Sequence, residues 1–305
     1  MRIVFLGTPG FALPTLNMLH RTFGLAAVVC QPDREKDRKG RLVEGAVRRR
    51  ANELSLPVYQ FEKVSRDGAA ALKGLRPDLM VTCAYGQLLS QEVLDIPPLG
   101  VLNVHGSLLP KYRGAAPIQR ALMAGEAETG VTVMKTDKGM DSGAIVSAVR
   151  VPVPDGMYVD GLYEALSEAG ARLLAETLPG YCSGELVPVP QDAAAATLAP
   201  PLKRADYLLD FSLGAETLRN QIRGAGEGHC LFRGEPFKVY RAELCPAAGK
   251  GGEVLRADKT GLCVACGAGA LVFTWVQAAG KKRMAAADFI NGSRIRTGER
   301  FENGR

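Results

Sequence analysis

The residues best suited to chemistry lie in a short segment near the middle of the chain. Asn103 and His105 are two positions apart at the end of an apolar stretch, and Gly106 follows directly. Because side chains alternate along a strand, the amide and the imidazole would project from the same face. They would meet at the carboxyl end of a strand, where open α/β sheets place their sites. A lone histidine at a strand end is usually structural, but its amide partner and the glycine favour a catalytic pair.

A glycine-rich loop between two predicted strands supplies a candidate carboxylate. The loop runs from Asp137 to Gly143 and also contains Asp141. Loops of this composition are usually simple turns, because aspartate and glycine both favour turn conformations. The alternative is that one of the two aspartates serves as a catalytic carboxylate.

The elements that must position these groups alternate between strands and helices over the first two-thirds of the chain. Apolar, β-branched runs predict strands at residues 2–7, 25–30, 58–59, 79–83, 102–105, 131–135 and 145–151. Helical patterns cover residues 12–20, 44–54, 68–75, 91–94, 117–124 and 160–178. This alternation predicts a Rossmann-like α/β domain, with a mostly parallel sheet and helices on both of its faces.

The composition changes sharply at residues 179–203, which are rich in proline and alanine. We therefore predict a linker over 181–203, between a catalytic domain over 1–180 and a C-terminal domain over 204–305. In the last part, short strand-like runs alternate with glycine-rich turns. This pattern predicts a small β-barrel of the oligonucleotide-binding (OB) type.

The first predicted strand ends in Gly7-Thr8-Pro9-Gly10, which raises the alternative of a nucleotide-binding turn. The segment is not the G-x-G-x-x-G pattern of dinucleotide-binding proteins, and it lacks the Lys-Ser/Thr of a P-loop. We therefore predict a tight strand-to-helix turn, and a nicotinamide-dependent dehydrogenase is disfavoured.

The net charge of +6 is distributed unevenly over the 305 residues. Residues 200–305 carry 17 basic and 11 acidic side chains, while residues 34–50 carry 8 basic and 3 acidic ones. Two basic regions suggest a polyanionic partner, with a solvated basic face as the alternative. No apolar run reaches the ~18 residues that a membrane span needs, so a cytoplasmic protein without membrane contact is expected. A monomer is expected by default.

The seven cysteines, at positions 30, 83, 182, 230, 245, 263 and 266, show no disulfide-framework spacing. Cys263 and Cys266 form an isolated CxxC pair, and the three histidines do not supply further zinc ligands at a matching spacing. We therefore predict reduced cysteines and no bound metal.

Several motifs together resemble the formyltransferase family that uses 10-formyltetrahydrofolate. The resemblance is carried by residues 103–110 (NVHGSLLP), 112–120 (YRGAAPIQR), 128–132 (ETGVT) and 141–143 (DSG). It extends to residues 5–9 (FLGTP), 31–34 (QPDR), 84–86 (AYG), 279–284 (AGKKRM) and 288–292 (DFING). Within the family, the chain is most similar to the members that act on methionyl-tRNA.

The resemblance implies a catalytic triad of Asn103, His105 and Asp141, and a pocket for folate as a co-substrate without a metal. The implied pocket is formed by two loops and by the loop that precedes Asp141. Its candidate residues are Ala84, Tyr85, Gly86, Gln87, Leu88, Ser107, Leu108, Leu109 and Pro110.

The resemblance also implies that the partner is a methionyl initiator tRNA, whose α-amino group receives the formyl group for translation initiation. A basic loop over residues 34–48 would enter the acceptor stem, with Arg38 aligned to an arginine that the family uses there. The C-terminal domain would hold the tRNA backbone. The candidate contacts are Arg34, Lys36, Arg38, Lys39, Arg41, Lys281, Lys282 and Arg283.

Formyl transfer calls for these groups because it passes through a tetrahedral intermediate with a developing oxyanion. Asn103 and protonated His105 can donate hydrogen bonds to it, and losing one such donor typically costs ~10²–10³ in rate. Asp141 beside the imidazole would favour its charged form, and it could accept the proton of the attacking amine through a water molecule.

Three other functions compete with this one. A formyltransferase with a small acceptor, such as glycinamide ribonucleotide or an amino sugar, would have little use for two basic regions. A 10-formyltetrahydrofolate hydrolase would use water as the acceptor. A non-catalytic nucleic-acid-binding protein fits the charge, but it leaves Asn103, His105 and Asp141 unexplained.

Overall fold

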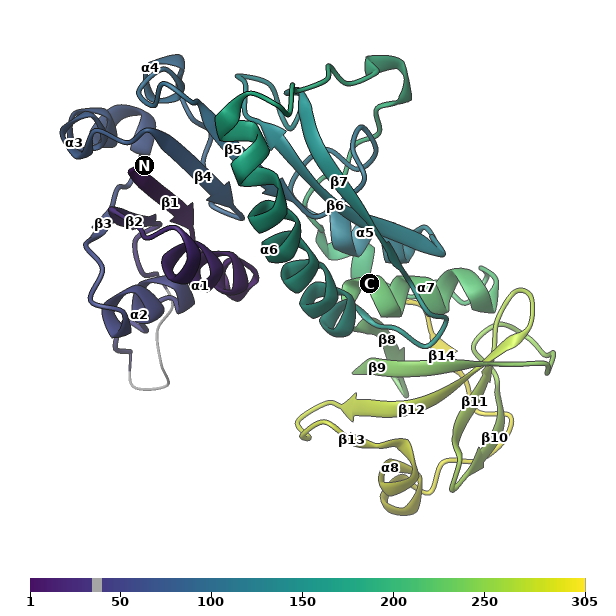
Figure 1. Ribbon diagram of the computed structural model, residues 1–305. Helices are drawn as coiled ribbons and strands as arrows, with labels where there is room; N and C mark the ends of the chain where they lie inside the picture. Colours follow the sequence, from purple (N-terminus) through teal and green to yellow (C-terminus); the bar gives the residue numbers. More distant parts are fainter. Residues whose placement is uncertain (35–39, 305) are drawn as a thin grey trace. The chain divides into compact units, whose positions relative to one another are not determined.

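The chain folds into two compact units, each built on one sheet (Figure 1). The computed structural model describes residues 1–34 and 40–304. The first unit comprises residues 1–117, 128–152 and 163–200. The second comprises residues 118–127 and 153–162, together with the chain from Pro201 onward.

A seven-stranded sheet forms the centre of the first unit, in the order β3-β2-β1-β4-β5-β6-β7. The strands from β3 to β5 are parallel, and β6 and β7 continue the sheet in antiparallel orientation. Their bounds are β1 Ile3–Gly7, β2 Ala27–Cys30, β3 Val58–Gln60, β4 Leu79–Cys83, β5 Val101–His105, β6 Glu128–Lys135 and β7 Ile145–Pro152. This arrangement confirms the predicted Rossmann-like, mostly parallel sheet.

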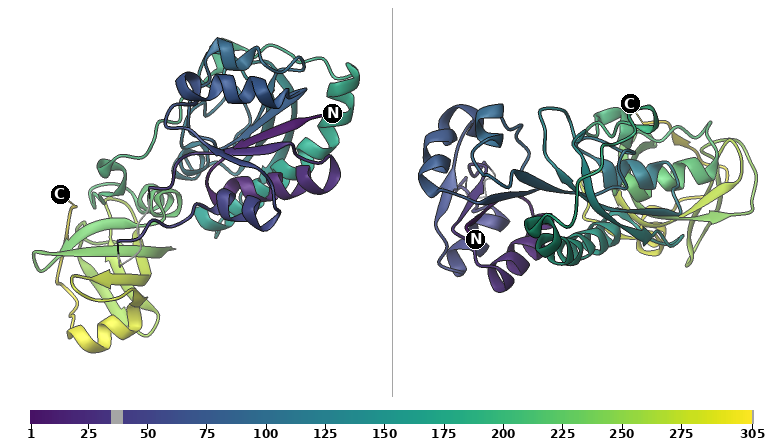
Figure 2. Two further views of the ribbon diagram at one scale, coloured as in Figure 1. Left: turned by 90° about the vertical axis from the view of Figure 1, so that its left-hand side faces the viewer. Right: turned by 45° about the horizontal axis from the view of Figure 1, so that its top comes forward.

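Helices cover both faces of this sheet, as Figure 2 shows from two further directions. On one face α6 approaches closely at Gly170, where an added β-carbon would lie 2.8 Å from Val104 and 3.3 Å from Val131. On the other face α3 and α4 pack around Val4 and Met80. The α-helices before residue 184 are α1 Leu13–Thr22, α2 Ala46–Glu53, α3 Ala69–Leu75, α4 Gln91–Leu94, α5 Pro117–Met123 and α6 Val159–Ser183, and the shorter helices of the first unit are η1 Gly10–Ala12, η2 Val64–Gly68 and η3 Ala193–Ala195.

The turn after β1 is tight, as predicted. An added β-carbon on Gly7 would lie 2.8 Å from the β-carbon of Ala12 and 2.8 Å from the Phe5 ring. Only glycine leaves room for the chain to turn directly from β1 into η1 and α1. This close packing explains why residue 7 is glycine, without a bound nucleotide.

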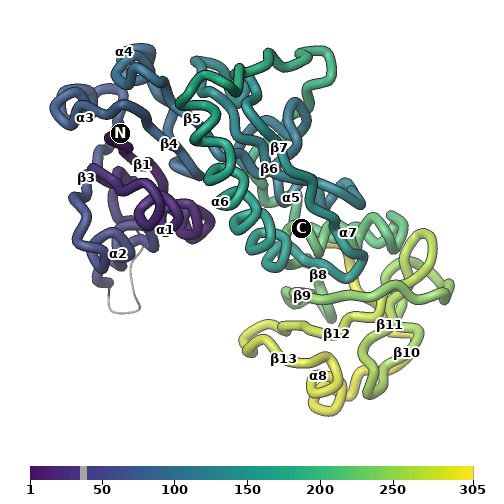
Figure 3. Tube along the Cα trace, viewed as in Figure 1, coloured from purple at the N-terminus to yellow at the C-terminus, as the bar shows by residue number. Residues whose placement is uncertain are grey.

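Helix α6 continues through Pro179 to Ser183, five residues beyond the predicted end at residue 178. A proline inside a helix removes one backbone hydrogen bond, so sequence alone favours an end near this position. The last turn is held by a tertiary contact, because the Tyr181 hydroxyl donates to the Leu99 carbonyl oxygen at 2.6 Å. Figure 3 traces the helix alongside the sheet.

The sheet of the second unit is antiparallel throughout, in the order β10-β11-β12-β9-β8-β14, with β13 paired to β12. Register shifts between Phe273 and Val276 mark irregularities in β12, and such bulges bend a strand and increase its twist. The sheet curls around a core of phenylalanine rings, among which Phe232 and Phe301 stack at 4.8 Å. The bounds are β8 Gly228–Phe232, β9 Glu235–Cys245, β10 Val254–Asp258, β11 Gly261–Ala265, β12 Ala270–Ala278, β13 Met284–Ala285 and β14 Phe301–Glu302. The predicted OB-like fold is confirmed.

Helix α7 (Ala215–Ala225) ties two earlier segments into the second unit, which also contains α8 (Ala286–Ser293) and η4 (Arg204–Tyr207). The buried guanidinium of Arg219 donates to the Asp155 carboxylate at 2.9 Å. An added β-carbon on Gly224 would lie 2.6 Å from the carbonyl oxygen of Gln119, so glycine lets α7 and α5 pack in direct contact. The sequence analysis predicts neither α7 nor α8.

Candidate active site

Strand β5 carries the two residues that the sequence pairs. Asn103 and His105 project from the same face, opposite to the face that Val104 presents to α6. The side chain of His105 is only 6% exposed, so its ring is fixed by neighbours rather than by solvent. After Gly106 the chain turns into a loop over residues 106–116, which supplies some of these neighbours.

Asp141 completes the cluster from the loop between β6 and β7. Its Oδ2 lies 3.6 Å from Nδ1 of His105, and its Oδ1 accepts a hydrogen bond from Nδ2 of Asn103 at 3.4 Å. The backbone N–H of Gly114 donates to Oδ2 at 2.9 Å. The structure therefore brings Asn103, His105 and Asp141 together, although Asp141 lies more than thirty residues farther along the chain.

The two aspartates of this loop have different surroundings. Asp137 accepts hydrogen bonds from the Gly139 N–H at 3.0 Å and from the Ser142 hydroxyl at 2.9 Å, so its carboxylate closes the turn. Asp141 faces the imidazole from a left-handed backbone conformation, with φ of 49°. Aspartate tolerates this conformation better than most residues, yet the conformation costs free energy and is typical of functional sites. Asp141 is therefore the candidate catalytic carboxylate.

Thr82 on the neighbouring strand β4 fixes the orientation of the Asn103 amide. The two residues are direct partners in the parallel register, and the Thr82 hydroxyl donates to Oδ1 of Asn103 at 2.9 Å. Since the carbonyl oxygen of the amide is held by a donor, the NH₂ group points toward Asp141. The amide keeps one further N–H that can be donated to a substrate.

Both ring nitrogens of His105 face oxygen acceptors. Nε2 lies 2.9 Å from the carbonyl oxygen of Tyr112, and Nδ1 faces the Asp141 carboxylate. The Tyr112 carbonyl oxygen can only accept a hydrogen bond, so Nε2 is the donor in this contact. Because Tyr112 occupies Nε2, Nδ1 is the nitrogen that can serve a reacting group.

Two family models match the chain. The model described as "Formyl transferase" matches residues 1–178, and the model described as "Formyl transferase, C-terminal domain" matches residues 201–294. The chain belongs to the formyl transferase family. Asn103, His105 and Asp141 all lie in the part of the chain that matches the first model.

Individual members of the family and their structural neighbours extend this result. The chain is 42% identical over 303 residues to "Methionyl-tRNA formyltransferase" of Citrifermentans bemidjiense, covering 98% of this chain and 95% of that protein. HypX from Aquifex aeolicus, solved in complex with tetrahydrofolic acid, shares the fold with a TM-score of 0.66 at 18% identity, over 98% of this chain and 48% of that one. WlaRD, a sugar 3N-formyl transferase, has a TM-score of 0.68 at 16% identity, over 92% and 99% of the two chains.

The residues predicted for a folate pocket lie in two loops that follow β4 and β5, at the same edge of the sheet as the triad. Ala84 and Gly86 both have positive φ, of 47° and 80°. Tyr85 packs in the core and is 3% exposed, whereas Leu88 is 73% exposed. The amide of Gln87 bonds to the backbone of residues 61–64 and so holds its own loop in place.

Thr132 on β6 anchors the second of these loops, Ser107–Pro110. Its hydroxyl donates to the carbonyl oxygen of Ser107 at 2.7 Å and accepts the N–H of Leu109 at 3.1 Å. The Ser107 hydroxyl is fully buried and donates to the Lys111 carbonyl oxygen at 2.7 Å, so it is occupied within the loop. Leu108 and Pro110 are partly exposed, and the Leu109–Pro110 peptide bond is cis.

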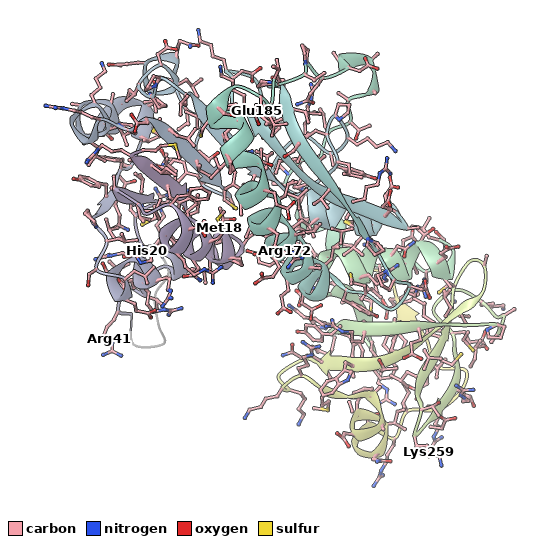
Figure 4. The ribbon with its side chains drawn as sticks, in the orientation of Figure 1. Met18, His20, Arg41, Arg172, Glu185 and Lys259 are labelled. Carbon is pink, nitrogen blue, oxygen red and sulfur yellow. The ribbon has the colours of Figure 1, made fainter. Side chains whose placement is uncertain are left out.

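The predicted basic residues fall into two groups, one in each unit. Arg34 and Arg41 are exposed, and Arg34 pairs with Glu62 at 2.8 Å (Arg41 is labelled in Figure 4). Lys36, Arg38 and Lys39 lie outside the described residues.

The second basic group follows β12 in the C-terminal unit. Lys281 and Lys282 are exposed. The guanidinium of Arg283 lies 4.4 Å from the centre of the Tyr240 ring and 5.5 Å from that of Trp275, which is 45% exposed. Such combinations of cations and exposed rings are typical of surfaces that bind single-stranded nucleic acid, and the sequence analysis does not single out Trp275.

The cysteines form no disulfide bonds, and five of the seven are buried. All seven are free, and burial raises the pKa of the Cys83 thiol to about 12 and that of Cys266 to about 11. Across residues 1–34 and 40–304, no group of three or more His, Cys, Asp or Glu side chains is arranged to hold a metal ion. Over the same ranges, no helix combines the length and the apolar composition that crossing a membrane requires.

Proposed function

We propose that this chain transfers the formyl group of 10-formyltetrahydrofolate to the α-amino group of methionyl initiator tRNA. The observation that carries the proposal is the cluster of Asn103, His105 and Asp141 at the end of β5, in a chain of the formyl transferase family. The acceptor is supported by 42% identity, over 98% of this chain, to a methionyl-tRNA formyltransferase.

The geometry suggests a role for each member of the triad. The acceptor amine attacks the formyl carbon, and the intermediate oxygen gains charge that the free N–H of Asn103 and the Nδ1–H of His105 can stabilise. Asp141 accepts the proton of the amine through a water molecule. When the intermediate collapses, the bond between the formyl carbon and N10 of the folate breaks, and a proton passes to that nitrogen. The formyl group ends on the amine.

The substrates would use separate parts of the chain. We assign the donor to the loops Ala84–Leu88 and Ser107–Pro110, because they lie at the same edge of the sheet as the triad. We assign the tRNA to the basic loop over residues 34–48 and to the domain over 204–305, where Lys281, Lys282 and Arg283 lie. Residues 1–180 would then be the catalytic domain. A tRNA acceptor favours a cytoplasmic location, and a monomer suffices because one chain supplies the whole triad.

The direct test is transfer of radiolabelled formyl from 10-formyltetrahydrofolate in three parallel reactions, containing initiator methionyl-tRNA, elongator methionyl-tRNA or no acceptor. We expect label on the initiator tRNA alone. Loss of label from the folate without a tRNA product would instead point to hydrolysis or to a small acceptor.

Replacing Lys282 with alanine should weaken tRNA binding in a salt-dependent way. Each phosphate contact that is lost lowers the slope of log Kd against log salt by about one unit. Lys259→Ala is the matched control, because Lys259 is also an exposed lysine but lies in the β10–β11 turn (Figure 4). Titrations of labelled tRNA at several salt concentrations measure both slopes. Equal slopes of log Kd against log salt for the two variants would show that Lys282 does not contact the tRNA.

Replacing Arg38 with alanine should raise the KM for methionyl-tRNA and leave the KM for the folate donor unchanged. Arg21→Ala removes an exposed arginine from α1 and serves as the control. Initial rates at limiting tRNA distinguish the two. Equal rates for Arg38→Ala and the parent protein would contradict a role for this residue in tRNA binding.

A further inference from the structure

The segment predicted as a linker includes residues 189–199, here termed the strap. The strap forms hydrogen bonds beside two loops of the active site, the β6–β7 loop that carries Asp141 and the loop over residues 106–116. Val189 exchanges two backbone hydrogen bonds of 2.8 Å with Ile145, the first residue of β7 after the Asp141 loop. At its other end, the strap accepts the N–H of Arg113 at the Thr197 carbonyl oxygen, at 2.8 Å. The strap belongs wholly to the first unit.

Gln191 links the two loops through its side-chain amide. Its Nε2 donates to the carbonyl oxygens of Asp141 at 2.9 Å and Gly143 at 2.7 Å. Its Oε1 accepts from the guanidinium of Arg113, at 2.7 Å from Nη2 and 3.0 Å from Nε. A glutamine amide has two hydrogens and two acceptor positions, so all four are used.

The hydrogen bonds of the Gln191 amide hold two segments that contact the triad. On one side is the main chain of Asp141, in its left-handed conformation with φ of 49°. On the other side is Arg113, whose sequence neighbours Tyr112 and Gly114 bond to His105 and to the Asp141 carboxylate. The strap reinforces this side as well, because the Thr197 hydroxyl accepts the Tyr112 N–H at 2.8 Å.

We infer that Gln191 is a positioning residue for the proposed formyl transfer. Its side-chain hydrogen bonds go to Arg113 and to the main chain of Asp141 and Gly143, so it acts by fixing the main chain from which the Asp141 carboxylate reaches the imidazole. A displacement of about 1 Å at a reacting group can cost on the order of 10²-fold in rate, so a clamp of this kind affects turnover more than binding. The inference rests on the proposed function for its readout in kcat.

Gln191→Glu is the sharpest variant. A glutamate keeps the size of the side chain and can still accept from Arg113, but it has no hydrogens to donate to the carbonyl oxygens of Asp141 and Gly143. Gln191→Met keeps a similar length without any hydrogen bonds or charge. It provides a second test in case the glutamate variant does not fold.

Gln221 offers a matched control in the second unit. Its Nε2 also donates to two backbone carbonyl oxygens, those of Asp206 at 3.0 Å and Leu208 at 2.9 Å. Gln221→Glu therefore removes the same pair of hydrogen bonds from a loop that carries no triad residue. Any general cost of this substitution to the stability of the protein appears in both variants.

We expect Gln191→Glu and Gln191→Met to lower kcat by about 10²-fold, with the KM values for folate and tRNA little changed, and Gln221→Glu to keep the kcat of the parent. Unchanged kcat in folded Gln191 variants would overturn the inference. So would a rise in KM without a fall in kcat.

A second readout does not depend on turnover. The chain has only three histidines, so the ring resonances of His105 can be identified by comparison with a His105 variant. We expect these resonances to move in Gln191→Glu and to stay in place in Gln221→Glu. If the parent formylated no acceptor but the His105 resonances still moved in Gln191→Glu, the proposed function would be wrong. The positioning of the triad by Gln191 would still be supported. Resonances unmoved by Gln191→Glu would remove the positioning role itself.

Discussion

Asp141→Asn is expected to lower kcat for formyl transfer by about 10²–10⁴-fold, the usual contribution of a general acid or base. Asparagine is the residue that best replaces aspartate in a left-handed conformation, so the φ of 49° at this position is preserved. Its amide can still accept the N–H of Gly114. What is lost is the negative charge beside His105 and the oxygen that would take a proton from the acceptor amine.

The same loop contains a control for this substitution. Asp137→Asn makes the same chemical change four residues away, at a carboxylate that accepts hydrogen bonds from Gly139 and Ser142 within its own turn. We expect it to keep most of the activity, because the turn can close on the remaining amide oxygen. Steady-state rates on initiator methionyl-tRNA compare the two variants, and thermal unfolding shows whether either has lost its fold. If Asp137→Asn were as impaired as Asp141→Asn, the effect would belong to the loop and not to the carboxylate.

The sheet and two members of the site could be predicted because their signals are local. The strand over residues 79–83 matches β4, and the alternation of side chains correctly places Asn103 and His105 on one face. The contact of Asp141 with them depends on where the β6–β7 loop lies in three dimensions. Periodicity does not contain that information, so composition and spacing leave Asp137 and Asp141 as alternatives. The choice of Asp141 rests on the family resemblance.

The residues that orient the triad could not be predicted, because each acts through backbone atoms or through a side chain without charge. Tyr112 and Gly114 contribute a carbonyl oxygen and an N–H, which the main chain offers at every residue except proline, which lacks the N–H. Thr82 bonds to Asn103 only because β4 and β5 pair in one particular register. Gln191 lies in a stretch whose prolines and alanines suggest a linker, and the tertiary contacts that hold it have no local pattern.

The second unit combines a sheet that local sequence features predict with two chain segments that they do not predict. The curled antiparallel sheet follows from short apolar runs separated by glycines, which are local features. Residues 118–127 and 153–162 join this unit through contacts with α7, such as the hydrogen bond from Nε of Arg223 to the Met157 carbonyl oxygen at 2.8 Å. No feature of these two segments marks them as belonging to a later part of the chain.

His105→Ala and His105→Gln should separate two contributions of the imidazole. Alanine removes both the imidazole and its hydrogen bond to Tyr112, and we expect kcat to fall by at least about 10²–10³-fold, as for loss of an oxyanion donor. Glutamine can donate an amide N–H to the Tyr112 carbonyl oxygen and so hold the 106–116 loop, but it cannot supply a charged donor to the oxyanion. If His105 acts by charge, the glutamine variant is as impaired as the alanine variant; if His105 mainly orders the loop, the glutamine variant recovers much of the rate.

His20→Ala, on α1, is the control for the loss of a histidine elsewhere in the same unit (Figure 4). Because the Asp141 carboxylate faces Nδ1 of His105, where glutamine places no charged donor, we expect equal impairment. Full turnover in either variant would exclude His105 from the chemistry.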